Sequence, residues 1–212
     1  MQIDIFSDTV CPWCYVGKRR FEAALAERPD LKPSIVWHPF ELNPDMADEG
    51  MDRDEFFTQR FGSTEKIEAA HVTLRSLGEG LGIPFDFEKC TRMPNTARSH
   101  ALIFWAQQQG LANAAVEALF KAYFVEGRDT GDHEVLADVA ASIGLDRELV
   151  AARLESDYDL EAIRAVSRRA RDLGLSGVPC FIINRKHAIV GAQEPEIFLD
   201  LFVRAEDEES AA

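Results

Sequence analysis

The sequence lacks a run of about 20 apolar residues, the length that an α-helix needs to cross a bilayer. It also lacks the basic segment, apolar stretch and small-residue cleavage site of a secretory signal, because Met1 leads directly into Ile3, Ile5 and Phe6. We therefore expect a cytoplasmic protein with no membrane partner.

Basic residues are scarce. The 212 residues include 23 Lys and Arg against 37 Asp and Glu, which gives a net charge of −14. A surface of this sign repels phosphate groups, so the composition excludes binding of nucleic acid through a general basic surface. With 46% hydrophobic residues, the chain is nevertheless long and apolar enough to build a proper core.

Cysteines are few, and they are unevenly spaced. A scaffold stapled by disulfides needs more than Cys11, Cys14, Cys90 and Cys180 at this length. Zinc is disfavoured for the close pair, because a structural zinc site usually adds a second close pair and the other two cysteines are isolated. No H-x-x-x-H spacing supports a metal either. Redox chemistry and an inert buried pair remain as explanations of the C-x-x-C.

Periodicity predicts a strand, a helix and a second strand in the first 44 residues, which together form a β-α-β unit. Almost all of the middle of the chain has helical spacing, and a long helix and a β-hairpin follow it. A closing helix and an acidic tail that we expect to be disordered complete the chain. The predicted elements are strands at 2–6, 35–40, 178–183 and 188–190, helices at 12–28, 156–174 and 195–203, and the tail at 206–212.

The sequence Cys11-Pro12-Trp13-Cys14 falls at the predicted start of the first helix. Thiol–disulfide exchange needs a thiolate that attacks and a second thiol that resolves the mixed disulfide. At a helix N-terminus the free N–H groups and the helix dipole stabilise a thiolate on Cys11, and Cys14 lies one turn deeper as the resolving thiol. Pro12 suits the first helical turn, and Trp13 shields one side of the sulfurs.

Three separated segments resemble the DsbA-like thioredoxin superfamily, and in particular its FrnE-type branch without signal peptides. The first joins Phe-Ser-Asp to Cys-Pro-Trp-Cys-Tyr-Val-Gly, the second is Phe-Glu-Leu-Asn-Pro, and the third is Gly-Val-Pro followed by Gly-Ala-Gln. They occupy 6–8 with 11–17, 40–44, and 177–179 with 191–193. All three in this order are more specific than a C-x-x-C alone.

The resemblance implies an α/β fold, namely a thioredoxin-like fold interrupted by an all-helical insertion subdomain. Residues 1–44 and 156–205 would form the thioredoxin-like part, and 45–155 the insertion. It also implies a cis peptide bond before Pro179, and substrate pairing with the main chain of Val178. The implied substrates are protein or small-molecule disulfides and dithiols. Glutathione or the thioredoxin system would recycle the pair, and no cofactor other than the redox-active disulfide is needed.

Two departures from the family pattern concern the surroundings of the cysteines. Thioredoxin-type proteins often carry a buried acid six residues before the first cysteine, where this chain has Ile5. Asp8 is a weaker candidate for proton transfer, because an acid in Ser-Asp-Thr is usually a turn residue. Cys180, directly after the expected cis-proline, replaces an apolar residue and is either a modulator or a small buried side chain. His100 is a further candidate neighbour of Cys11.

Two other functions compete with disulfide exchange. Glutathione-dependent isomerases and transferases of the 2-hydroxychromene-2-carboxylate isomerase (kappa) type share the insertion, but they typically place a serine at the position of Cys11. A non-catalytic partner-binding module would make both cysteines dispensable, which is hard to reconcile with the Cys-Pro-Trp-Cys sequence.

Overall fold

The computed structural model describes residues 1–62, 65–157 and 159–210. In this part of the chain a four-stranded sheet has the order β2-β1-β5-β6. β1 and β2 are parallel, whereas β5 runs antiparallel to both β1 and β6. The strands are β1 (Gln2–Ser7), β2 (Ser34–Pro39), β5 (Cys180–Ile183) and β6 (His187–Val190). The predicted fold class, a thioredoxin-like α/β fold with a helical insertion, is confirmed.

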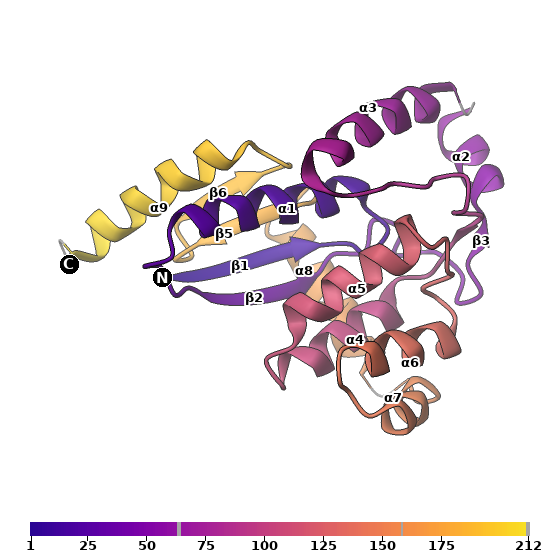
Figure 1. Ribbon diagram of the computed structural model, residues 1–212. Helices are drawn as coiled ribbons and strands as arrows, with labels where there is room; N and C mark the ends of the chain where they lie inside the picture. The colour runs from indigo at the N-terminus through magenta and orange to yellow at the C-terminus, as the bar shows by residue number, and fades with distance from the viewer. Residues whose placement is uncertain (63–64, 158, 211–212) are drawn as a thin grey trace.

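Two helices cover one face of the sheet, and others pack against its β2 edge (Figure 1). On the first face lie α1 (Pro12–Glu27) and α9 (Pro195–Ser210), which contact each other. Against β2 lie α4 (Ala97–Gln107) and α8 (Leu160–Asp172). No helix in the described ranges is both long and apolar enough to cross a membrane.

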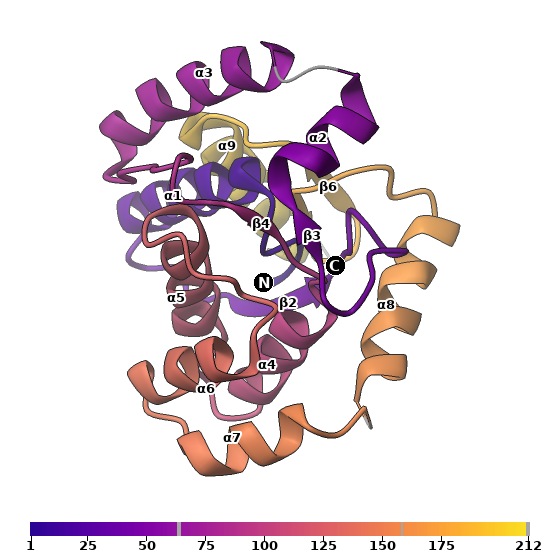
Figure 2. The ribbon, with the colours of Figure 1, turned by 90° about the vertical axis from the view of Figure 1, so that its right-hand side faces the viewer.

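The segment between β2 and α8 wraps around the end of the sheet at which β1 finishes (Figures 1 and 2). It is helical as predicted, apart from a two-stranded ribbon of β3 (Met51–Asp52) and β4 (Arg92–Met93). Besides α4 it contains α2 (Arg53–Phe61), α3 (Glu65–Leu81), α5 (Ala112–Phe124), α6 (His133–Ser142) and α7 (Arg147–Leu154). The boundaries 44/45 and 155/156 stay a prediction.

The insertion and the sheet share one hydrophobic core. A single cluster of buried side chains runs from Ile3 and Ile5 in β1 to Phe120 in α5 and Leu154 in α7. An ion pair adds to this packing, because the buried Lys18 of α1 contacts the partly buried Glu117 of α5 at 2.8 Å. Helix α1 is thereby fixed between the sheet and the insertion, and its N-terminus is held where both meet.

Two predicted elements need correction. The helix expected over 156–174 begins only at Leu160. The acidic tail expected to be disordered from residue 206 instead continues α9 to Ser210, while residues 211–212 lie outside the described part. Its carboxylates find partners on neighbouring elements: Glu206 pairs with Arg28 at 2.9 Å and Glu208 with His187 at 3.0 Å. These contacts favour helix where composition alone predicted disorder.

Candidate active site

The Cys-x-x-Cys segment lies at the N-terminus of α1, directly after β1. Cys11 is the N-cap residue, with extended backbone angles, and Pro12 occupies the first turn, where its missing N–H breaks no helical hydrogen bond. The backbone N–H of Cys11 donates to the carbonyl of Asp8 at 3.1 Å, which fixes the turn between strand and helix. All four cysteines of the chain are described, and all are free thiols.

Cys14 lies deeper than Cys11, since its exposed fraction is 1% against 5%. Burial raises the pKa of the Cys14 thiol well above its usual range, and the neighbouring Cys11 thiol adds to the rise. Hydrogen bonds from the Asp8 backbone and the Ser7 side chain act in the opposite direction, because they favour a thiolate. The Cys14 thiol is thus a weak acid, and its deprotonation requires a nearby proton acceptor.

The segment before β5 lies against the cysteine pair. The peptide bond between Val178 and Pro179 is cis, the geometry that the family resemblance implies. The Val178 carbonyl lies 3.8 Å from the Cys11 sulfur. Helix α1 approaches Pro179 closely at Gly17, where an added Cβ would lie 2.8 Å from the proline Cγ. Glycine at this position therefore lets the proline reach the cysteines.

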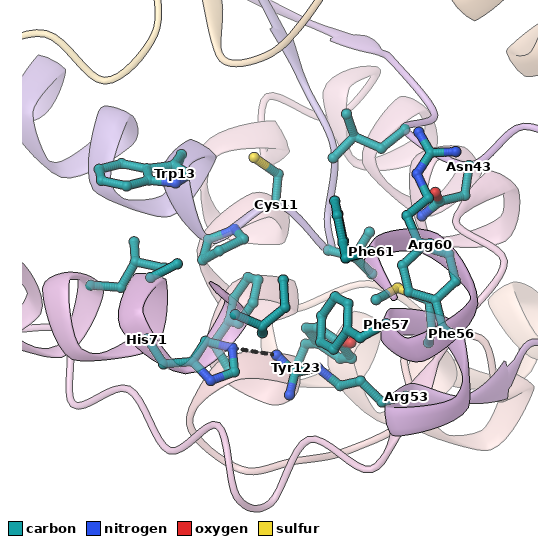
Figure 3. A pocket seen from close by; sticks show the side chains of 18 residues that line it. Cys11, Trp13, Asn43, Arg53, Phe56, Phe57, Arg60, Phe61, His71 and Tyr123 are labelled. Atoms are coloured by element: carbon teal, nitrogen blue, oxygen red, sulfur yellow. Dashed lines mark hydrogen bonds between the residues drawn. The ribbon is translucent and has the colours of Figure 1, made fainter. Parts of the chain in front are cut away.

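A cavity of about 310 Å³ opens in front of Cys11 (Figure 3). Cys11 and Trp13 lie on one side of it, and aromatic side chains of α2 face them from the other. Cys14 is not among the residues that line it. The aromatic part of the lining consists of Trp13, Phe56, Phe57, Phe61, Tyr123 and Phe124. A substrate sulfur that enters the cavity meets Cys11 and has no access to Cys14.

An arginine–histidine pair also lines this cavity. A nitrogen of the Arg53 guanidinium lies 3.0 Å from His71 Nε2, and the guanidinium stacks 4.7 Å from the Phe57 ring centroid. Burial, and then the charge of Arg53, lower the pKa of His71 to about 4. His71 is therefore neutral at physiological pH and accepts a hydrogen bond from the arginine.

Asp8 and His100, both candidate site residues in the sequence analysis, lie close to each other and do not line the front cavity. Asp8 and His100 are both buried, and the Asp8 Oδ1 lies 3.3 Å from the His100 Nε2. The other carboxylate oxygen of Asp8 accepts a hydrogen bond from the Leu42 N–H at 2.7 Å. The Ser-Asp-Thr sequence predicts an exposed turn residue at Asp8, whereas the structure buries this side chain, with an exposed fraction of 0%.

The two remaining cysteines are buried thiols away from the cavity lining. Cys180 lies in β5 opposite Phe6, and burial raises its pKa. Cys90 donates to the Tyr123 carbonyl at 3.1 Å, and burial raises its pKa to about 11. Neither environment favours a thiolate.

Comparison of the chain with known proteins agrees with the thioredoxin-like fold described above. A family model described as DSBA-like thioredoxin domain matches residues 2–203. The chain belongs to this family. A crystal structure from Streptomyces coelicolor, described as a "probable DsbA oxidoreductase", is 33% identical to this DsbA-like chain, covers 98% of it and 91% of its own length, and superposes with a TM-score of 0.89.

Two more distant structures share the fold with this DsbA-like chain. The cytosolic disulfide reductase DsbM of Pseudomonas aeruginosa, solved with glutathione, is 23% identical, covers 96% of this chain and 98% of its own, and has a TM-score of 0.69. A 2-hydroxychromene-2-carboxylate isomerase is 19% identical over 100% of this chain and 98% of its own, with a TM-score of 0.74.

Sequence reasoning missed the far wall of the front cavity in this DsbA-like chain. Phe57, Phe61 and His71 lie on two insertion helices, and Tyr123 on a third. The spacing of Phe57 and Phe61, one helical turn apart, was the available signal, but it is equally typical of an ordinary core face. Ser7 and the buried Glu41 were also missed, although both belong to segments that carry the family resemblance.

Proposed function

We propose that this protein is a dithiol–disulfide oxidoreductase of the FrnE type, in which Cys11 attacks a substrate disulfide and Cys14 resolves the mixed disulfide. The observation that carries the proposal is the unequal placement of the two free thiols. Cys11 lines the substrate-sized cavity at a helix N-terminus, and Cys14 lies buried one turn behind it. In disulfide exchange an accessible thiolate attacks the substrate, and a second thiol within reach then resolves the mixed disulfide.

The reaction balances without a bound cofactor. A Cys11 thiolate attacks one sulfur of the substrate disulfide and expels the other as a thiolate. Cys14 then loses its proton, attacks the Cys11 sulfur and releases the second substrate thiolate, so the substrate is reduced and the Cys11–Cys14 pair is oxidised. The reverse sequence oxidises a substrate dithiol. The Val178 carbonyl, close to the Cys11 sulfur, supports substrate pairing with the main chain at this point.

The apolar lining of the front cavity favours substrate disulfides that carry an apolar group beside the sulfur. Such a substrate is either a protein or a small molecule. We place the reaction in the cytoplasm, with glutathione or the thioredoxin system as the recycling partner. The cytosolic DsbM structure with glutathione, which shares the fold, supports this part of the proposal.

The decisive experiment compares two single variants. Cys11→Ser should abolish both insulin-disulfide reduction and oxidative refolding of a reduced test protein, because no thiolate remains to attack. Cys14→Ser should instead accumulate a covalent mixed disulfide on Cys11, visible by intact mass spectrometry. Undiminished turnover by Cys11→Ser would contradict the mechanism, and the relative rates of the two assays give the preferred direction.

A glutathione-dependent isomerase is the second candidate, favoured by one observation: the aromatic-lined cavity beside Cys11 can receive a flat hydrophobic substrate. The isomerase structure with the same fold is consistent with that reading. Turnover of a chromene substrate that needs glutathione and survives Cys14→Ser would support this candidate. The absence of such turnover, together with loss of disulfide exchange in that variant, would favour the oxidoreductase.

A further inference from the structure

A buried acid–imidazole pair lies behind the cysteines, and the exchange reaction written above does not use it. Asp8 and His100 have exposed side-chain fractions of 0% and 3%, with 3.3 Å between Oδ1 and Nε2. Neither of these two atoms has a hydrogen-bond partner. A buried polar atom without a hydrogen-bond partner destabilises the fold by about 1–3 kcal/mol, so packing alone does not explain this pair.

The surrounding contacts hold this pair against the active-site turn. The Leu42 N–H and the Cys11 N–H bind the side chain and the carbonyl of Asp8, at 2.7 and 3.1 Å. Next to it, the Thr9 and Ser99 hydroxyls share a hydrogen bond of 2.7 Å, which ties the turn to α4 one residue before His100. These contacts therefore connect the pair directly to the Cys-x-x-Cys turn.

A second cavity, of about 260 Å³, which we call the rear cavity, reaches His100 between β2, α4 and α8. Its lining includes His100 and Ser7, and also Phe104 and Val166, which are exposed, so the cavity extends to the surface between α4 and α8. Among the described residues, none lines both this rear cavity and the front one. Its volume accommodates several water molecules, each of which takes about 30 Å³ in the liquid.

The resolving step needs a proton acceptor at this place. Cys14 attacks only as a thiolate, and its side chain does not line the front cavity, so its proton needs an acceptor elsewhere. The strand position at which many thioredoxin-type proteins carry a buried acid holds Ile5, a side chain without a titratable group. The Ser7 side chain lies near enough to Cys14 to act against the rise in its thiol pKa, and Ser7 lines the rear cavity together with His100.

We propose that His100, oriented by Asp8, accepts the proton of Cys14 through Ser7 and releases it to solvent through the rear cavity. The inference rests on the proposed oxidoreductase function. In this relay the Nε2–H of His100 faces the Asp8 carboxylate, so that Nδ1 is the ring nitrogen that takes the proton. When Cys14 attacks Cys11, the substrate thiolate leaves into the front cavity while the proton leaves by the rear. In the oxidising direction the same groups return the proton to Cys14.

Other charged groups near this relay set its electrostatics. Glu41 is buried with its Oε1 unpaired, and burial raises its pKa while the charge of His100 lowers it. Asp159 binds the Trp105 indole N–H, and His38 binds Asp4. Among the described residues, Arg164 and Arg171 also act on Glu41, and His38 and Asp159 line the rear cavity. No group of three acidic, His or Cys side chains in the described ranges is arranged to hold a metal ion.

The two half-reactions can be followed separately with substoichiometric 5,5′-dithiobis(2-nitrobenzoate). The first release of thionitrobenzoate reports attack by Cys11, and the second reports resolution by Cys14. His100→Gln should leave the first phase within twofold and slow the second roughly 100-fold near neutral pH, the lower end of the range for general acid–base catalysis. Asp8→Asn should act in the same direction. His187→Gln, which alters an imidazole on β6 that lines neither the front nor the rear cavity, should change neither phase.

Two further readouts separate a proton relay from a structural role. The second phase of the wild type should show a titration step that His100→Gln lacks, so that the rate of the variant simply rises with hydroxide. In His100→Ala, added imidazole should restore the second phase, because the rear cavity is open to solvent and large enough to receive it.

An unchanged second phase and pH profile in His100→Gln, or equal slowing of both phases, would overturn the relay. Failure of the function itself would look different. In that case the wild type would lack the second phase, or Cys14→Ser would retain it.

Discussion

At the residue scale, the four cysteines of this chain are all free thiols, but their surroundings differ. Cys11 borders a cavity at a helix N-terminus, whereas Cys14, Cys90 and Cys180 lie away from it, each with burial as the main cause of a raised pKa. A raised thiol pKa lowers the thiolate fraction, and only the thiolate reacts. Reactivity should therefore concentrate on one sulfur.

Brief treatment of the native, reduced protein with iodoacetamide should attach a single carboxamidomethyl group, on Cys11, as peptide mass spectrometry would show. Cys11→Ser should remain unlabelled under the same conditions, and unfolding in denaturant should expose every thiol. Labelling of Cys180 at a rate comparable to that of Cys11 would contradict this concentration of reactivity on Cys11.

At the element scale, the position of α1 depends on one close approach. A Cβ at Gly17 would meet the Pro179 ring at 2.8 Å and Phe181 at 3.5 Å, so helix and proline must separate if the side chain grows. Gly80 on α3 offers the matched case, because an added Cβ there meets nothing within 4 Å. The same substitution thus has opposite expected effects on two helices.

Gly17→Ala should destabilise the fold by about 1–3 kcal/mol, the usual cost of overpacking, and should slow attack by Cys11. Gly80→Ala should stabilise the fold by up to about 1 kcal/mol, because alanine is the better helix former, and should leave the rate unchanged. Urea unfolding and the first phase of thionitrobenzoate release measure both effects. Equal stability changes in the two variants would mean that α1 does not rely on this contact.

At the scale of the whole molecule, the insertion and the sheet share one core, so a charge introduced in the insertion should destabilise the entire fold. His71 provides such a charge, since its pKa falls from 6.5 to about 4 through burial first and the charge of Arg53 second. Glu68, Arg75 and Glu88 also face it, with smaller effects. Between these pH values the unfolded chain binds a proton that the folded chain does not.

The contribution of His71 to stability is therefore complete above about pH 6.5 and declines as the pH falls toward about 4. In this window His71→Gln, which keeps an acceptor for Arg53 but cannot take a proton, should flatten the slope of the unfolding free energy by up to about 1.4 kcal/mol per pH unit. Urea unfolding at several pH values measures it, with His133→Gln on the partly exposed surface of α6 as control. Identical slopes in the wild type and His71→Gln would contradict a buried neutral imidazole.

What the sequence determined is local. Proline after a cysteine, at the end of an apolar strand, is enough to predict a helix start, and the helical pitch then places Cys14 one turn below Cys11. The same local logic failed at the end of α9, where acidic residues find partners on Arg28 and His187 that composition cannot reveal.

The tertiary structure decided which side chains surround the cysteines. The far wall of the front cavity comes from α2, α3 and α5, and no periodicity shows which helix face will turn toward Cys11. Asp8 reads as a turn residue in the sequence, and only the packing of α4 against the active-site turn buries it beside His100. Burial and proximity between distant segments are properties of the whole packed core, whereas the cysteine spacing is a property of one helical turn.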